Sequence, residues 1–337
     1  AAYYRHASKY VNPVIIQEWR NKQDSLFMQF KDQEQGLVLA GDGRCDSPGH
    51  CAKYGSYTVI EQTMNRVLDF QLVQSNEVRN SSWMELEGLK RSVDLLTTAD
   101  LTIDTLSTDR SRSIGKYIRE ELPDTTHYYD IWHVAKGLGK KIDKVAKQKD
   151  CGDIAEWKQS ISNHMYWCAA STPDGNGDMI KAKWEILPLH IQDIHTSNNV
   201  LHSECGHGEL EGERRDKLWM EPGERSYATV KLEDLLLNKI LLKDVTKLSP
   251  VYQTSNLEAK HSLDIQFVPK HTAFSYWGMQ TRLCLSALHY NENADRAQAV
   301  DKDGNPAYSI TFPKAKKGQY SVRPRKTKVT YGLLWQL

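Results

Sequence analysis

The chain has 337 residues, of which 39% are hydrophobic and 26% are charged, and its formal net charge is +1. These fractions are ordinary for a globular protein, and the length allows one large core with an insertion or two domains. The chain lacks a run of 18 apolar residues, a signal-peptide layout and a strongly basic balance, and its six cysteines are scattered. We therefore exclude a membrane span and a disulfide framework, and we expect an intracellular protein.

Residues 1–35 are predicted to form a helical lead-in, after which the chain turns to strands. The apolar run LVLAGD at 37–42 predicts a buried strand. The alternating segments 55–63 and 66–74 predict two more strands, joined by short turns. Three consecutive strands with tight connections indicate an antiparallel meander.

Helices and strands alternate in the next part of the chain. A helix is predicted over 81–96, with Ser82 as its N-cap, and a fourth strand over 101–109. A second helix, over 111–122, ends before a proline, and HYYDIWHV at 127–134 predicts a fifth strand. This order is the ribonuclease H-like order, which predicts an α/β fold with a mixed five-stranded sheet and helices on both faces.

Three carboxylates stand out because of their positions in these elements. Asp42 ends the first strand, Asp109 ends the fourth, and Glu258 lies in SNLEAKHSL, which can open as a helix. Carboxylates in this arrangement could hold two divalent ions, as in-line phosphoryl transfer needs. Asp46 is a rival of Asp42 but lies in a turn. Asp104 is a rival of Asp109, but alternation places it on the opposite face of a regular strand.

Several strings of the chain, taken in order, resemble those of a known family. They are GDGRCDSPGHCAKYGSYT, STDRSRSIGKYI, HYYDIWHVAKGL, SNLEAKHS and GMQTRLCLSALHYNEN, and they are similar to strings of Kolobok-type elements and of transposon-derived animal genes. With the acids placed as above, residues 36–295 resemble the catalytic domain of a cut-and-paste DNA transposase of the DDE superfamily. The abrupt start and the lack of a recognisable site-specific DNA-binding domain lead us to expect a catalytic core from a longer protein.

The resemblance implies a reaction and a set of partners. Asp42, Asp109 and Glu258 would ligate two Mg²⁺ or Mn²⁺ ions for phosphodiester hydrolysis and then strand transfer, without a covalent enzyme intermediate. The partners would be the double-stranded DNA of the transposon ends and of the target, in the nucleus. Because paired DNA ends are processed together, we expect a homo-oligomer, and we expect no membrane.

The distance in sequence between Asp109 and Glu258 is larger than a ribonuclease H fold needs. Residues 36–136 would form the first half of that domain and residues 251–295 its last helices. Residues 137–250 are therefore expected to be a mainly helical insertion, which resembles the arrangement in hAT transposases.

A short motif follows the expected fifth strand. Asp130 and His133, in YYDIWHVAK, resemble the Cys/Asp-x-x-His motif that several such families carry there. The resemblance implies that the motif orients the site or contacts DNA. The alternative is a histidine packed under the insertion with a satisfied ring nitrogen.

The expected insertion also contains a cluster of nitrogen and sulfur ligands, with four histidines and one cysteine within 18 residues. The side chains that match the pairwise spacing of a structural zinc site are His190, His195, Cys205 and His207. His202 is an alternate ligand, and Cys168 is a further candidate from the preceding helix. The alternative is a polar surface loop with a chance cluster.

Basic side chains near the expected active face could contact a DNA backbone. They are Arg110, Lys136, Lys140 and Lys141. A basic C-terminal tail, residues 296–337, contains AKKGQY and RPRKTK, which could attract phosphates or nuclear import factors.

Two other classes of function remain open. The chain could be a domesticated transposase remnant that binds DNA or protein without cutting, which a triad held too far apart to share metals would favour. It could also be a zinc protein whose His/Cys cluster is the working site, which an open coordination position would favour.

Overall fold

The computed structural model describes residues 2–33, 35–47, 52–212, 215–216, 218–222, 226–251, 254–314 and 318–332. The chain divides into two compact units, residues 1–102 with 255–337, and residues 103–254. The second unit is a continuous segment, and the first is made of the two segments that flank it. Within the described ranges, no helix is long and apolar enough to cross a membrane.

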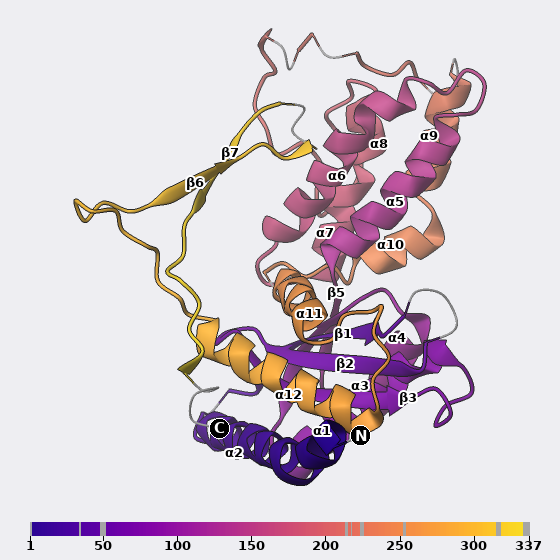
Figure 1. The fold of residues 1–337 in the computed structure, drawn as a ribbon. Helices are drawn as coiled ribbons and strands as arrows, with labels where there is room; N and C mark the ends of the chain where they lie inside the picture. The colour runs from indigo at the N-terminus through magenta and orange to yellow at the C-terminus, as the bar shows by residue number, and fades with distance from the viewer. Residues whose placement is uncertain are drawn as a thin grey trace. The chain divides into compact units, whose positions relative to one another are not determined.

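Five strands form one mixed sheet (Figure 1). They are β1 Leu37–Cys45, β2 Tyr54–Glu61, β3 Arg66–Gln74, β4 Ile103–Thr108 and β5 Thr126–Tyr129. The strand order is β3-β2-β1-β4-β5, in which β2 pairs antiparallel with β1 and with β3, and β4 pairs parallel with β5. The α/β class, the meander of the first three strands and the presence of the fourth and fifth are as predicted.

Helices of the first unit pack on both faces of its strands. These helical elements are α1 Ala2–His6, a π-helical turn Ala7–Val11, α2 Asn12–Lys31, a 3-10 turn Ser81–Trp83, α3 Met84–Thr98, α11 Ser255–Phe267 and α12 Tyr276–Asn293. Because side chains alternate along a strand, Ala40 and Ile60 face the core that α2 and α12 share, whereas Tyr57 faces α3. A Cβ on Gly88 would lie 2.4 Å from Cβ of Tyr57, so α3 approaches the sheet closely only because residue 88 is glycine.

The second unit is mainly helical. Besides β4 and β5 it contains α4 Arg112–Glu121, α5 Ile131–Val145, α6 Ile154–Ala170, α7 Gly177–Glu185, α8 Leu187–Ile191, α9 Tyr227–Leu236 and α10 Lys239–Val245. The apolar faces of α5 to α10 enclose a core that contains Trp157 and Trp184, each at most 1% exposed. Nε1 of Trp184 donates a hydrogen bond to the carbonyl of Leu236 at 2.9 Å, which satisfies the buried ring nitrogen. The unit starts at residue 103, before the insertion expected over 137–250.

Two strand ends differ from the prediction. β1 continues to Cys45, so Asp42 lies inside the strand and not at its end. The fifth strand ends at Tyr129, and the residues predicted to continue it form the start of α5. The reason is Asp130, whose Oδ1 accepts a hydrogen bond from the backbone N–H of Trp132 at 3.0 Å and so caps the helix.

The start of the helical segment before β4 also differs from the prediction. Asn80 caps the 3-10 turn that leads into α3, because its Oδ1 accepts a hydrogen bond from the backbone N–H of Ser82 at 3.1 Å. Ser82 is therefore inside the turn and is not the N-cap.

The C-terminal segment, predicted only as a basic tail, contains regular structure. Strands β6 Tyr308–Thr311 and β7 Ser321–Pro324 pair antiparallel as a two-stranded ribbon beyond α12 (Figure 1). Part of the predicted basic run AKKGQY, residues 315–317, lies outside the described residues.

Candidate metal-binding sites

Asp109 lies directly after β4, where the backbone leaves the sheet and turns toward α4. Its carbonyl oxygen accepts hydrogen bonds from Oγ1 of Thr108 at 2.9 Å and from the backbone N–H of Ser111 at 2.7 Å. Its side chain is 27% exposed. The carboxylate is therefore half-buried, on a backbone that two hydrogen bonds hold in place.

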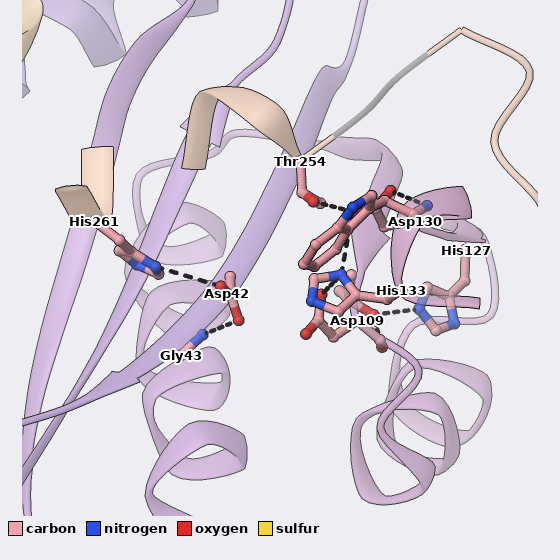
Figure 2. Close-up of polar contacts among 10 residues, drawn as sticks. Asp42, Gly43, Asp109, His127, Asp130, His133, Thr254 and His261 are labelled. Carbon is pink, nitrogen blue, oxygen red and sulfur yellow. Dashed lines mark hydrogen bonds and ion pairs between the residues drawn. The ribbon is translucent and has the colours of Figure 1, made fainter. Parts of the chain in front are cut away.

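His133 lies between two carboxylates (Figure 2). Its Nδ1 is 2.7 Å from Oδ1 of Asp109 and 3.2 Å from Oδ2 of Asp130. His133 belongs to the first turn of α5, three residues after Asp130, and side chains with this spacing lie on the same side of a helix. The Asp-x-x-His segment therefore reaches Asp109 through its histidine.

The charge of His133 follows from these two partners. Burial lowers the pKa of the ring, but the hydrogen bonds to Asp109 and Asp130 and the charges of both carboxylates outweigh burial and raise the pKa to about 10. In the metal-free protein the ring is therefore protonated at neutral pH. It supplies a positive charge between two carboxylates and contacts Asp109 directly.

Asp130 is more enclosed than Asp109, with 3% of its surface exposed. Burial raises its pKa, but hydrogen bonds from His133, from Oγ1 of Thr254 and from the backbone N–H of Trp132 outweigh burial and lower the pKa. Asp130 is therefore ionised and surrounded by donors. It is suited to hold His133 in place, while Asp109 is the carboxylate that faces outward.

A second histidine near Asp109 is neutral. Nε2 of His127 is 2.9 Å from Oγ1 of Thr108, and burial together with the charge of Lys247 lowers the pKa of this ring to about 3. Of the two histidines beside the end of β4, only His133 carries a charge at neutral pH.

The group formed by Asp109, Asp130 and His133 could hold a metal ion. One ligand atom from each of the three lies within 4.8 Å of the others. Carboxylates suit Mg²⁺ and Mn²⁺, and an imidazole can join them once it has lost its proton. A divalent ion would replace the positive charge that the imidazolium supplies.

In the first unit, Asp42 faces α11 (Figure 2). Its Oδ2 is 3.3 Å from Nδ1 of His261, and its Oδ1 accepts a hydrogen bond from the backbone N–H of Gly43 at 2.7 Å. Glu258 lies one turn before His261 on the same helix, and its side chain is exposed. The first unit by itself therefore brings Asp42 next to the helix that carries Glu258, whereas Asp109 belongs to the second unit.

The two rival acids have other surroundings. Oδ1 of Asp46 accepts a hydrogen bond from the backbone N–H of Lys53 at 3.1 Å, and the N–H of Asp46 donates to the carbonyl of Tyr54 at 3.0 Å. Asp46 therefore closes the turn between β1 and β2. Asp104 is exposed within β4. It lies an odd number of residues before Asp109, so alternation places its side chain on the opposite face of the strand.

The predicted DNA-contacting side chains fall into two groups. Arg110 forms an ion pair with Asp244, which neutralises part of its charge. Lys136, Lys140 and Lys141 are exposed on α5, and Nζ of Lys136 lies 3.9 Å from the centroid of the Trp132 ring. Lys136 and Lys140 follow His133 by one and two helical turns, so they continue its side of α5.

The second unit also brings together the four predicted nitrogen and sulfur ligands, His190, His195, Cys205 and His207. One ligand atom from each lies within 4.8 Å of the others. Sγ of Cys205 and Nε2 of His207 are each 3.4 Å from Nδ1 of His190. Ligands bound at about 2.0–2.3 Å around a tetrahedral zinc ion lie about 3.3–3.8 Å apart, so these distances fit four ligands of one zinc ion.

His195 adds a separate indication of a metal site. Its Nδ1 is buried and has no hydrogen-bond partner among the described residues, while its Nε2 is 3.0 Å from Oδ1 of Asp193. Asp193 in turn accepts two hydrogen bonds from Nη1 of Arg215, at 2.7 and 2.6 Å. When Nε2 donates its proton to the Asp193 carboxylate, Nδ1 keeps a lone pair. This is the usual state of a histidine that ligates zinc.

His202 and Cys168 are not part of this group. The His202 ring lies 6.0 Å from the ring of Trp167, and Cys168 is fully buried in the helical core. Burial raises the pKa of the Cys168 thiol, which opposes the thiolate that a metal needs. Cys168 is therefore a core residue.

Comparison of the sequence with protein-family models and with curated proteins finds no match.

Three partners of the predicted site residues were not predicted. His261 could have been found, because it stands one helical turn after Glu258 in the segment that was already assigned to a helix. Thr254 contacts Asp130 across a large separation in sequence. Asp193 lies two residues before His195, and an aspartate near a histidine is common in sequences. No local pattern distinguishes these last two residues.

Proposed function

We propose that this chain is the catalytic core of a DNA transposase of the DDE superfamily, with a ribonuclease H-like fold. The observation that carries the proposal is the place of Asp109, which directly follows β4 and is held by His133 of the Asp-x-x-His segment. The strand order β3-β2-β1-β4-β5 supports it, because the first acid, Asp42, belongs to β1, the strand next to β4 in that order.

In this proposal Asp42, Asp109 and Glu258 hold two Mg²⁺ or Mn²⁺ ions. The ions would supply an activated water, or later an activated DNA 3′-hydroxyl, and would stabilise the leaving oxygen. His133 and Asp130 orient the Asp109 carboxylate through the contacts described above. The reaction is phosphodiester hydrolysis followed by strand transfer into target DNA, carried out in the nucleus by an assembly of several copies.

The lysines of α5 are proposed to contact the DNA backbone. Lys136 and Lys140 lie on the same side of the helix as His133, and Lys141 is also exposed. Arg110 contributes less, because Asp244 neutralises part of its charge.

We also propose that His190, His195, Cys205 and His207 bind a structural Zn²⁺ ion. The buried Nδ1 of His195 carries this assignment, because it has no hydrogen-bond partner in the part of the chain that the structure describes, and a bound metal would recover the free energy that this costs. Four protein ligands complete a tetrahedron and leave no open position for a substrate. The site is therefore proposed to stabilise the loop and not to react.

A cleavage assay on supercoiled plasmid and linear duplex DNA, with Mg²⁺ or Mn²⁺, tests the proposed chemistry. Asp42→Asn, Asp109→Asn and Glu258→Gln are each expected to reduce cleavage by a factor of about 10³ or more, because each removes a metal-binding charge. Asp46→Asn and Asp104→Asn are the matched controls, and both should cleave at the wild-type rate.

Three outcomes would contradict the proposal. Cleavage that persists in all three variants would show that the acids do not hold the catalytic ions. Binding of DNA by the wild-type chain without any cleavage would favour a transposase-derived binding factor, and zinc binding with no affinity for DNA would favour a structural zinc protein.

A further inference from the structure

The ribbon of β6 and β7 has one apolar face and one polar face. In its antiparallel register Tyr308 lies opposite Pro324, and Ile310 lies opposite Val322. Opposite residues share a face, and alternate residues along a strand share it too. The side chains of the apolar face are therefore Tyr308, Ile310, Phe312, Tyr320 and Val322.

These five side chains are exposed. Each has between 51% and 69% of its surface accessible in the described part of the chain. A two-stranded ribbon is at best marginally stable alone in water, and a contiguous exposed apolar face marks a surface that another molecule covers. The apolar face is thus incomplete as a surface of a single copy.

The opposite face of the ribbon is polar and basic. It carries Ser309, Thr311, Ser321 and Arg323, with Arg325 continuing the same side beyond β7. Residues 296–337 contain nine lysines and arginines but two aspartates, whereas the whole chain has a net charge of +1. Within β6 and β7 the charged side chain is Arg323, which is on this face, so the five side chains of the apolar face carry no charge.

We propose that the apolar face of the ribbon binds the same face of a second copy of this chain, as a two-fold symmetric contact. A face without charge is complementary to itself, because stacking two copies brings no like charges together. The basic faces would point outward on both sides and would stay in water. The proposal stands on the ribbon and does not depend on the proposed catalysis.

The area is sufficient for such a contact. A fully covered aromatic side chain buries 150–250 Å², so five side chains with the measured exposures would remove about 500–600 Å² from water per copy. The pair would then bury about 1,100 Å², which is near the lower limit of specific interfaces.

Nucleic acid fits the apolar face poorly. A duplex presents phosphates, which would be attracted to Arg323 and Arg325 on the other side of the ribbon. DNA bound to the basic face would leave the apolar face exposed. A second copy covers that face without burying a charge.

Sedimentation velocity of the full chain at concentrations up to about 100 μM tests the proposal. We expect the wild-type chain to dimerise and Ile310→Asp to weaken dimerisation at least about 100-fold, because two carboxylates would be buried without partners. Thr311→Asp is the matched control, since it places the same side chain on the neighbouring position of the same strand but on the polar face. It should dimerise like the wild type.

A second measurement identifies the contact directly. Ile310→Cys should form a disulfide between two copies under mild oxidation, and Thr311→Cys should not. A wild-type chain that stays monomeric, or a dimer that Ile310→Asp leaves intact, would overturn the proposal. A monomer whose apolar face binds neutral phospholipid vesicles, with binding lost in Ile310→Asp, would also overturn it in favour of a membrane surface.

Discussion

The two clusters of metal-ligating side chains in the second unit differ in charge and in completeness. Asp109, Asp130 and His133 form a group with two carboxylates, in which a protonated ring already supplies one positive charge. The cluster of His190, His195, Cys205 and His207 has four nitrogen and sulfur side chains that could hold one metal ion, and it contains no carboxylate. The imidazolium of His133 therefore neutralises part of the charge of the first group, whereas the second group has a buried ring nitrogen with no hydrogen-bond partner among the described residues.

This difference separates two uses of metal. A set of carboxylates with an outward-facing member can bind an ion and still leave coordination positions for water and phosphate. A set of four nitrogen and sulfur ligands fills the coordination of zinc, and the bound ion then stabilises the fold. Clustering alone does not distinguish the two uses, but ligand type and exposure do.

The largest expected effect is on stability at the His/Cys cluster. His207→Ala is expected to abolish zinc binding and to lower the free energy of unfolding of the zinc-loaded chain by about 3 kcal/mol or more. His207 is exposed, so without a metal its removal would cost almost nothing. Zinc content and chemical denaturation would measure the change. His202→Ala, in the same loop but outside the cluster, should keep its zinc.

A smaller effect is expected from the outer partner of His195. Asp193→Asn should reduce zinc affinity by about 10–100-fold, because the carboxylate fixes the ring that ligates the metal. Competition with a chromophoric chelator would measure the affinity. Unchanged affinity would mean that His195 is not a ligand.

The Asp109 group should respond to cations in another way. His133→Asn removes the positive charge between two carboxylates, and we expect it to lower metal-free stability by about 1–2 kcal/mol. Mn²⁺ should restore much of this loss, because a bound cation replaces the missing charge. Thermal unfolding with and without Mn²⁺ would show the rescue.

His127→Asn is the control for that experiment. His127 is neutral and half-buried, so its replacement should destabilise the chain to the same degree with and without Mn²⁺. Equal rescue of the two variants would contradict a cation site at Asp109.

The smallest expected effect is on DNA binding. Lys140→Ala should weaken binding to a duplex by a factor of about 3–5 at moderate salt and reduce the salt slope by about 1. Lys149→Ala, an exposed lysine in the turn after α5, is the control. If both variants bind like the wild type, α5 is not part of the DNA surface.

Much of the fold could be predicted from the sequence because its signals are local. The apolar run of β1, the alternation of β2 and β3 and the proline after α4 each fix an element within a few residues. The start of α5 was predicted wrongly because the β-branched and aromatic residues of DIWHV favour a strand, whereas Asp130 caps a helix there. The β6–β7 ribbon was not predicted, because each of its strands is only four residues long and the basic residues around them are typical of a solvated tail.

The two candidate sites also differ in how far local sequence could predict them. The four ligands of the His/Cys cluster lie within one short segment, and their spacing predicted the grouping that the structure has. The contact of Asp109 with His133 joins a strand end to a helix start. The resemblance implied that the motif with His133 orients the site or contacts DNA, but it did not name Asp109 as the partner. Thr254 reaches Asp130 from 124 residues away, a pairing that local pattern cannot supply.

The most direct test of the proposed chemistry is anomalous diffraction from crystals of the chain soaked in MnCl₂, recorded at the manganese and zinc edges. The proposal predicts a manganese peak about 2.0–2.3 Å from a carboxylate oxygen of Asp109, with Asp42 and Glu258 completing the site, and a separate zinc peak among His190, His195, Cys205 and His207. Manganese bound only at the His/Cys cluster, with Asp109 still paired to His133, would contradict it.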